Sequence, residues 1–240
     1  PGFKKIHSDW YQYVLENFNN CKIPEGPPST LGLEDMAKIE TLMEFWYPPK
    51  GSSRHLCPSS EAGKVHFAGK SIDQTIRDKF LNLYEQIVSG ELDHWKQDHI
   101  GRLAQIIVLD NLSRNMFRGT AKAFATDPKA YELAKVITDD LSIFNQYKDL
   151  EKFSILLVLM HREDATVIKK CNELMELQIK VSMDAGNDRM ADHWTLGLKF
   201  GKSHLVPVEK FGRYPTRNEA IGRENTQEET DFLKNAESWG

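Results

Sequence analysis

The sequence predicts an all-α protein, and three observations carry that prediction. Apolar residues recur at three- and four-residue spacing over most of the 240 residues. No segment shows the strict alternation of apolar and polar residues that a half-buried strand needs. Proline, glycine and capping residues separate the periodic stretches. We expect about eight helices, joined mainly by short loops into an all-α domain.

The first periodic stretch follows Ser8 and carries Trp10, Val14 and Phe18. The Pro-Glu-Gly-Pro-Pro sequence at residues 24–28 is typical of a linker. We therefore expect residues 1–29 to form an N-terminal extension with a short helix, and residues 30–240 to form a single all-helical domain. The extension could pack on its own domain or dock on another chain.

Thr30 is positioned to cap a helix that carries Leu33 to Trp46 and stops at Pro48-Pro49. A loop is expected over residues 50–70. Ser71 and Gln74 have the spacing of a capping box, and the helix that follows them should end at Gly90.

Later boundaries come from similar signals. A buried helix is expected from about Asp98 to Leu112. Asp127 should cap the next one, with Pro128 at its first position. Buried or amphipathic helices are then expected over 150–161, from Asp164 onward, and from about Asn187 to Pro207. Thr226 to Glu229 is a second capping box.

Composition excludes several classes of function. The net charge is -4 and the pI about 6.1, so we expect no nucleic-acid partner. The longest apolar run, Ile106 to Leu109, is far too short to span a membrane. Three scattered cysteines give neither a disulfide framework nor a metal pattern. These features indicate a soluble intracellular protein of the cytoplasm or an organelle matrix. No targeting segment is visible, no metal site is expected, and the cofactor is unknown.

The first polar cluster follows the most apolar helix. Asp110, Arg114 and Arg118 are four residues apart and can share one helical face with Asn115 beside them. One interpretation is a salt-bridge ladder that ties the helix end to its neighbours. The other is an anion clamp, because a buried arginine needs either partners or a ligand.

A second cluster follows another apolar helix. His161 is followed by Glu163 and Asp164, and a carboxylate beside an imidazole raises its pKa and fixes its tautomer. That arrangement suits a general base if substrate can reach it. It equally suits a histidine held in place by a helix cap.

The third cluster is a shaped turn that contains Gly212 and Pro215. Arginines on a rigid loop can recognise a ligand, or can anchor the loop. The candidate ligand-binding residues of this region, with one histidine that precedes the turn, are His204, Arg213, Arg217, Asn218 and Arg223.

These motifs together resemble the DUF924 family, an uncharacterised group common in bacteria. The resemblance covers about residues 33–235 and is carried by the segments 43–48, 90–95, 103–110, 114–120, 123–127, 211–215, 217–218, 222–223 and 226–229. It implies an all-helical, tetratricopeptide-like array of antiparallel helix pairs. It implies no established activity.

The chain departs from that family pattern at two polar positions. The family usually has Glu-His-Ser-Glu where this chain has Met160-His161-Arg162-Glu163, and Phe-Pro-His-Arg-Asn where it has Tyr214-Pro215-Thr216-Arg217-Asn218. It also usually has Asp-Gln-Phe-Pro-Arg-Asn at residues 110–115. Met160 and Thr216 thus replace a carboxylate and a histidine, which favours binding over catalysis.

The sequence therefore predicts a helical binding domain with a polar cleft, lined by arginine, asparagine and histidine of these clusters, that holds an anionic small molecule or the acidic segment of a protein partner. One alternative is a small hydrolase or transferase with His161 as base and Glu163 orienting it. Another is a structural or assembly subunit. Oligomeric state is not predicted.

Overall fold

The computed structural model describes residues 27–47 and 69–234. Over these residues the chain forms helices and no strand, so the all-α class is confirmed. Most of the predicted extension, residues 1–29, and most of the predicted loop at 50–70 lie outside the described residues. No helix in the described part of the chain is long and apolar enough to cross a membrane.

Contacts divide the chain into two compact units. The central unit holds the described residues up to Arg118, together with Lys122–Val158. The C-terminal unit holds Gly119–Ala121 and the described residues from Leu159 onward. The expectation of one domain over residues 30–240 stays a prediction.

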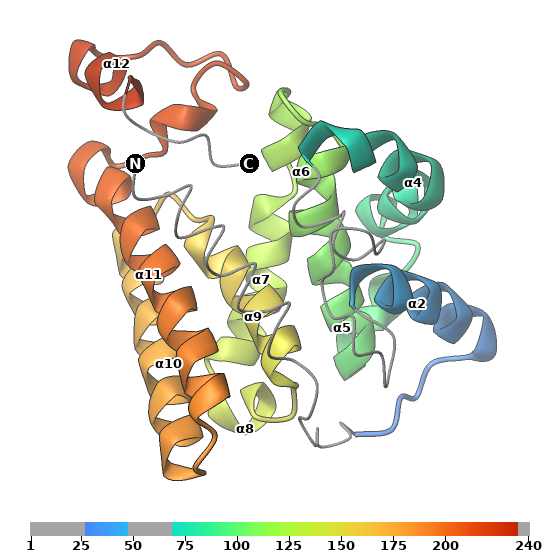
Figure 1. The fold of residues 1–240 in the computed structure, drawn as a ribbon. Coiled ribbons are helices and arrows are strands. Elements are labelled where there is room, and N and C mark those ends of the chain that lie inside the picture. The colour runs from blue at the N-terminus through green and yellow to red at the C-terminus, as the bar shows by residue number, and fades with distance from the viewer. Residues whose placement is uncertain (1–26, 48–68, 235–240) are drawn as a thin grey trace. The chain divides into compact units, whose positions relative to one another are not determined.

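The central unit contains most of the helices seen in Figure 1. In chain order they are α2 (Leu33–Trp46), α4 (Asp73–Ser89), α5 (His99–Ile106), a π-helical turn (Ile107–Leu112), α6 (Ser113–Met116), α7 (Asp127–Thr138), α8 (Leu141–Phe144) and α9 (Asp149–Met160, of which Leu159 and Met160 belong to the other unit).

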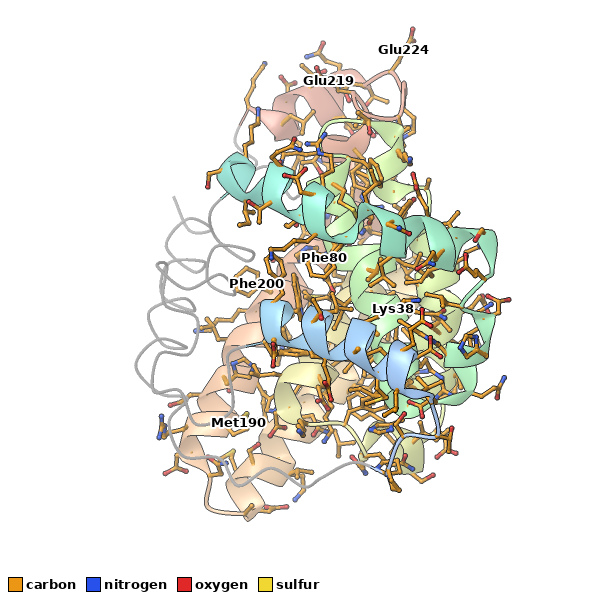
Figure 2. All side chains as sticks on the ribbon, turned by 90° about the vertical axis from the view of Figure 1, so that its right-hand side faces the viewer. Lys38, Phe80, Met190, Phe200, Glu219 and Glu224 are labelled. Atoms are coloured by element: carbon orange, nitrogen blue, oxygen red, sulfur yellow. The ribbon has the colours of Figure 1, made fainter. Side chains whose placement is uncertain are left out.

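The core of the central unit forms around the run from α5 to α6. Leu103 to Leu112 are all buried: the apolar run Ile106 to Leu109 lies at their centre, and Gln105, Asp110 and Asn111 are buried with it. Helix α4 turns Ile76 and Phe80 inward, and the Phe80 ring meets Phe45 of α2 edge to face at 4.9 Å. Figure 2 labels Phe80 on α4 and Lys38 on α2.

A π-helical turn interrupts this buried helix at Ile107–Leu112. A π turn shifts the backbone hydrogen bonds and is often found at functional sites. Side chains bond the carbonyls there: Thr126 Oγ1 donates to Leu109 O at 2.6 Å, and Ser113 Oγ donates to the same oxygen at 2.8 Å. Polar residues thus stabilise an irregular turn inside an apolar core.

The C-terminal unit is built on a long helix pair. Helices α10 (Ala165–Asp184) and α11 (Asp188–Phe211) run antiparallel and side by side, joined by a three-residue turn (Figure 1). After them come a 3-10 turn (Pro215–Arg217) and α12 (Gln227–Leu233). One such pair agrees with antiparallel packing, while a tetratricopeptide-like array stays a prediction.

A glycine allows the two long helices to approach closely. A Cβ placed on Gly201 of α11 would lie 2.0 Å from Asn172 Oδ1 of α10. A real Cβ does not approach another atom so closely, so the missing Cβ leaves the space that the Asn172 side chain occupies.

Four predicted boundaries are wrong. Asp127 does not cap α7 but is its first residue, and Thr126 is at the N-cap position. Thr30 does not cap α2, whose N-cap is Gly32; the Thr30 amide instead donates to Asp98. Ser71 is not the N-cap of α4, because residues Gly69–Ile72 form a 3-10 turn and α4 begins at Asp73 with Ile72 at the N-cap position. Helix α11 does not end at Pro207 but runs through it to Phe211. A proline there removes one backbone hydrogen bond, and the packing against α10 outweighs that loss.

Other boundary predictions are confirmed. Gly90 ends α4 in the left-handed conformation, with φ 89°. Asp164 caps α10 and Asn187 caps α11 through their side chains. Thr226 and Glu229 form the predicted capping box of α12. These signals are local, which is why the sequence reveals them.

Candidate functional site

The first candidate cluster lies in the central unit and is centred on Arg114. Its Nη1 lies 3.0 Å from Asp110 Oδ1 and donates to the Asp110 carbonyl at 2.7 Å. Its Nη2 donates to Asp127 Oδ2 at 3.0 Å. Arg114 is 8% exposed, Asp110 0% and Asp127 6%. The guanidinium therefore joins the π turn to the start of α7 inside the protein.

Arg118 belongs to a neighbouring set of contacts. It makes two hydrogen bonds to the Asp73 carboxylate, at 2.8 and 3.1 Å, and Asn115 Nδ2 donates to the same carboxylate at 3.1 Å. Asp73 is the first residue of α4. These bonds fasten α6 to the start of α4, so Arg118 does not continue the Asp110–Arg114 stripe.

Both arginines of this cluster thus have carboxylate partners from other helices. The contacts agree with the salt-bridge ladder that the sequence allowed. Paired guanidinium and carboxylate groups neutralise one another, which makes their burial tolerable. The anion clamp at these positions has no contact in its favour and stays a prediction.

The second cluster lies in the C-terminal unit and is centred on Glu163. Arg223 binds its carboxylate through both terminal nitrogens, at 2.8 and 2.7 Å, and the Tyr214 amide donates to it at 2.8 Å. Burial raises the pKa of the Glu163 carboxyl, but the bonds from Arg223 and Tyr214 outweigh it and hold the pKa below its ordinary value. Glu163 therefore fastens the turn after α11 to the turn before α10.

Arg213 and Glu229 form a second two-armed pair. Arg213 donates to the two carboxylate oxygens at 2.7 and 2.8 Å, and Glu229 also caps α12 by accepting from the Thr226 amide. These bonds, Arg213 first, lower the pKa of the Glu229 carboxyl to about 2. Asn218 is fully buried and donates to Asn225 Oδ1 at 2.7 Å. Arg213, Asn218 and Glu229 shape the C-terminal segment.

Two histidines, a tyrosine and an arginine meet in the same unit. The His161 and His204 rings lie 6.2 Å apart, and the His204 ring meets Tyr214 edge to face at 6.0 Å. The Arg217 guanidinium lies 4.8 Å above the Tyr214 ring and donates to the His161 carbonyl at 2.7 Å. We call these four residues the imidazole cluster.

The imidazole cluster rests on a small apolar base. Tyr214 packs with Ile168 and Val208, and its hydroxyl donates to the Met160 carbonyl. His204 Nδ1 lies 2.9 Å from the Phe200 carbonyl. A carbonyl only accepts hydrogen bonds, so Nδ1 carries the proton in this contact.

The structure therefore places the predicted site residues in two separate groups. Asp110, Arg114, Asn115 and Arg118 come together in the central unit; the C-terminal unit holds the others, which are His161, Glu163, His204, Arg213, Arg217, Asn218 and Arg223. A single cleft that combines Arg114 with Arg217 stays a prediction.

Sequence reasoning missed the carboxylates that hold the arginines. Asp127 and Glu229 appeared in it only as helix-start residues, and Asp73 had no role. One signal was present: all three lie in the first turn of a helix, where acidic residues are common. No group of three or more metal-ligating side chains is found among residues 27–47 and 69–234.

The protein is therefore of the all-helical class, and arginine–carboxylate ion pairs join the ends of its helices. The sequence matches the family described as "Bacterial protein of unknown function (DUF924)" over residues 42–237. The chain belongs to this family, as its motifs suggested.

A solved structure agrees. A protein of unknown function from Agrobacterium tumefaciens is 25% identical and has a TM-score of 0.62, and the match covers 84% of this chain and 99% of that one. No curated protein matches the chain.

Proposed function

We propose that this protein is a helical binding domain that holds an anionic small molecule through the imidazole cluster of its C-terminal unit. The observation that carries the proposal is that Arg217, His161, His204 and Tyr214 converge from three separate segments. A guanidinium above an aromatic ring, in a cluster with two imidazoles, is a suitable arrangement for a carboxylate or phosphate.

The remaining arginines are better explained as architecture. Arg114, Arg118, Arg213 and Arg223 each bind a carboxylate of the protein itself. A ligand anion would have to compete with those partners, at the cost of leaving a carboxylate buried without its cation. Arg217 and His161 are half-buried, so a ligand can approach them.

Titration of the full chain with inorganic phosphate tests the proposal. The imidazole NMR signals of His161 and His204 should move together and saturate at constant ionic strength. Arg217→Met should weaken binding by about tenfold, the effect of losing one charge-assisted bond. Lys199→Met, on the exposed face of α11, is the matched control and should bind as the parent does.

Two outcomes count against the proposal. One is an unchanged pair of histidine signals throughout the titration. The other is a response that sodium chloride reproduces at equal ionic strength. A short acidic peptide, titrated in parallel, separates a small anion from a protein segment: preference for the peptide would assign the site to a partner chain.

The catalytic alternative, with His161 as base, has weaker support. Glu163 accepts hydrogen bonds from Arg223 and Tyr214, and Asp164 caps α10 through Thr166 and Val167. Both carboxylates that could orient the His161 imidazole therefore accept hydrogen bonds from other groups. The role of the protein as an assembly subunit rests on residues 1–29, most of which lie outside the described residues.

A further inference from the structure

A pocket in the central unit has no part in the proposed function. Its volume is about 260 Å³, and Pro28, Gln97, His99, Arg102, Ile143 and Gln146 are among the residues that line it. Drug-sized ligands occupy roughly 300–1,000 Å³. The pocket is therefore suited to a molecule smaller than a nucleotide.

The segment before α2 forms one wall of this pocket. Ser29 Oγ and the Thr30 amide donate to Asp98 Oδ2 at 2.8 and 2.9 Å, which holds Pro27 and Pro28 beside the start of α5. The family match begins only at residue 42. This wall is thus contributed by residues that the family match does not include.

Asp98 lines the pocket but is not available to a ligand. Its Oδ1 accepts from the Ile100 and Gly101 amides, and its Oδ2 accepts from Ser29 and Thr30. Burial raises the pKa of the Asp98 carboxyl, but these bonds outweigh it and hold the pKa below its ordinary value. The carboxylate stays ionised, and both of its oxygens already accept hydrogen bonds from the protein.

The polar groups that remain in the pocket are mainly donors. Arg102 is half-buried; its Nε donates to the Lys96 carbonyl at 3.0 Å, and it also bonds the Tyr147 hydroxyl. A guanidinium has five N–H donors, so these two bonds leave others for a ligand. The amides of Gln97 and Gln146 add donors. Pro27, Pro28 and Ile143 supply an apolar wall.

Titratable groups gather around the same pocket. Burial lowers the pKa of His99, so its imidazole is neutral at pH 7. Burial also raises the pKa of Tyr147 to about 12, and that hydroxyl donates to the His99 carbonyl at 2.9 Å. Convergent polar groups of this kind beside a concave pocket are typical of ligand sites.

We infer that this pocket binds a small monocarboxylate with a short apolar body. The carboxylate pairs with Arg102 and accepts from Gln97 or Gln146, while the body lies against Pro28 and Ile143. One guanidinium matches one carboxylate in charge and in its two-armed geometry. The inference is independent of the imidazole cluster, which lies in the other unit.

The test is an NMR titration of the full chain with sodium acetate, propionate, butyrate and benzoate. The side-chain signals of Arg102 Nε–H and of the Gln97 and Gln146 amides should shift and saturate. Affinity should rise by about fourfold for each added methylene, the effect of burying one such group. Acetamide and benzamide, which lack the charge, should bind at least tenfold more weakly.

Two variants locate the site. Arg102→Gln should lower butyrate affinity at least tenfold, whereas Arg77→Gln, an exposed arginine of α4, should leave it unchanged. Ile143→Trp fills the pocket without removing a polar group and should also lower affinity at least tenfold. It keeps the test valid if Arg102→Gln does not fold.

Equal affinity for acids and amides would overturn the inference, as would unchanged affinity in Ile143→Trp. Absence of any shift at the pocket signals would do the same. Arg217→Met should have no effect on butyrate binding. Failure at the pocket and failure at the imidazole cluster are therefore distinguished by which signals respond.

Discussion

Arg114 and Asp110 are joined twice: the guanidinium donates to the Asp110 carbonyl at 2.7 Å and lies 3.0 Å from its carboxylate. The same side chain that neutralises the buried aspartate therefore also stabilises the π turn in which that aspartate lies. Arg114→Met would leave Asp110 and Asp127 buried without their cation. We expect a loss of about 3–5 kcal/mol in the free energy of unfolding, measured by urea denaturation.

Arg77→Met is the control for this change, because Arg77 is exposed on the same unit. Its effect should stay within about 0.5 kcal/mol. Arg114→Lys keeps the charge but not the planar fork, so it should fall between the two. If Arg114→Met is as stable as the parent, the clamp is not architectural.

The π turn also depends on a hydroxyl of Thr126, which donates to the Leu109 carbonyl at 2.6 Å. Thr126→Val keeps the shape and removes the donor. Since Thr126 and Leu109 are buried, the expected cost is about 1–3 kcal/mol. Thr126→Ser retains the hydroxyl and should therefore keep most of the stability that Thr126→Val loses. Equal unfolding midpoints for the two variants would contradict this assignment.

A side chain at Gly201 should displace the end of the Asn172 side chain. Its added Cβ would meet Asn172 Oδ1 at 2.0 Å, inside the α10–α11 interface. Gly201→Ala should destabilise the protein by about 1–3 kcal/mol, the usual cost of overpacking. Gly32→Ala is the control, because no atom lies within 4 Å of its added Cβ. Asn172→Ala combined with Gly201→Ala should restore part of the stability if this contact is the cause.

The free energy of unfolding should fall as the pH is lowered, partly because of His193. This residue is fully buried beside Trp194, and burial lowers its pKa from 6.5 to about 4. The unfolded chain binds a proton at His193 more readily than the folded chain does. The contribution of His193 to the free energy of unfolding is therefore fully present above pH 6.5 and is lost as pH falls toward 4. The slope in that window is about 1.4 kcal/mol per pH unit.

His193→Gln removes the titrating imidazole. Comparison with the parent therefore measures the contribution of His193 to the free energy of unfolding. The difference in unfolding free energy between parent and variant should depend on pH between 6.5 and 4 and be constant above pH 7. A difference that stays constant across the whole range would show that His193 does not titrate on unfolding. Glu163 and Glu229 lose their contributions at lower pH, since their pKa values are lowered.

Local signals made much of the fold predictable. The caps Asp164, Asn187 and Thr226 and the terminal Gly90 act within one helical turn, so neighbouring residues in the sequence are enough to reveal them. The failures at Ser71 and Pro207 have the opposite cause. There the local preference is weaker than packing against distant residues.

The candidate site was predicted less completely. The polar clusters were found because arginine and asparagine are unusual directly after apolar helices. Their partners Asp73, Asp127 and Glu229 lie 13 to 45 residues away, at separations that sequence spacing does not reveal. The pocket beside Arg102 had no signal, because its walls come from three separate segments.

The sequence by itself determined the all-α class, the family, and most helix ends, because these depend on periodicity, capping and motif identity. Tertiary structure alone decided what the arginines do. A guanidinium can clamp a ligand or a carboxylate of its own chain, and the energies differ only through burial and geometry. Four arginines form ion pairs with carboxylates on other helices or turns of the fold: Arg114, Arg118, Arg213 and Arg223. That outcome depends on which helices pack together, which no short stretch of sequence specifies.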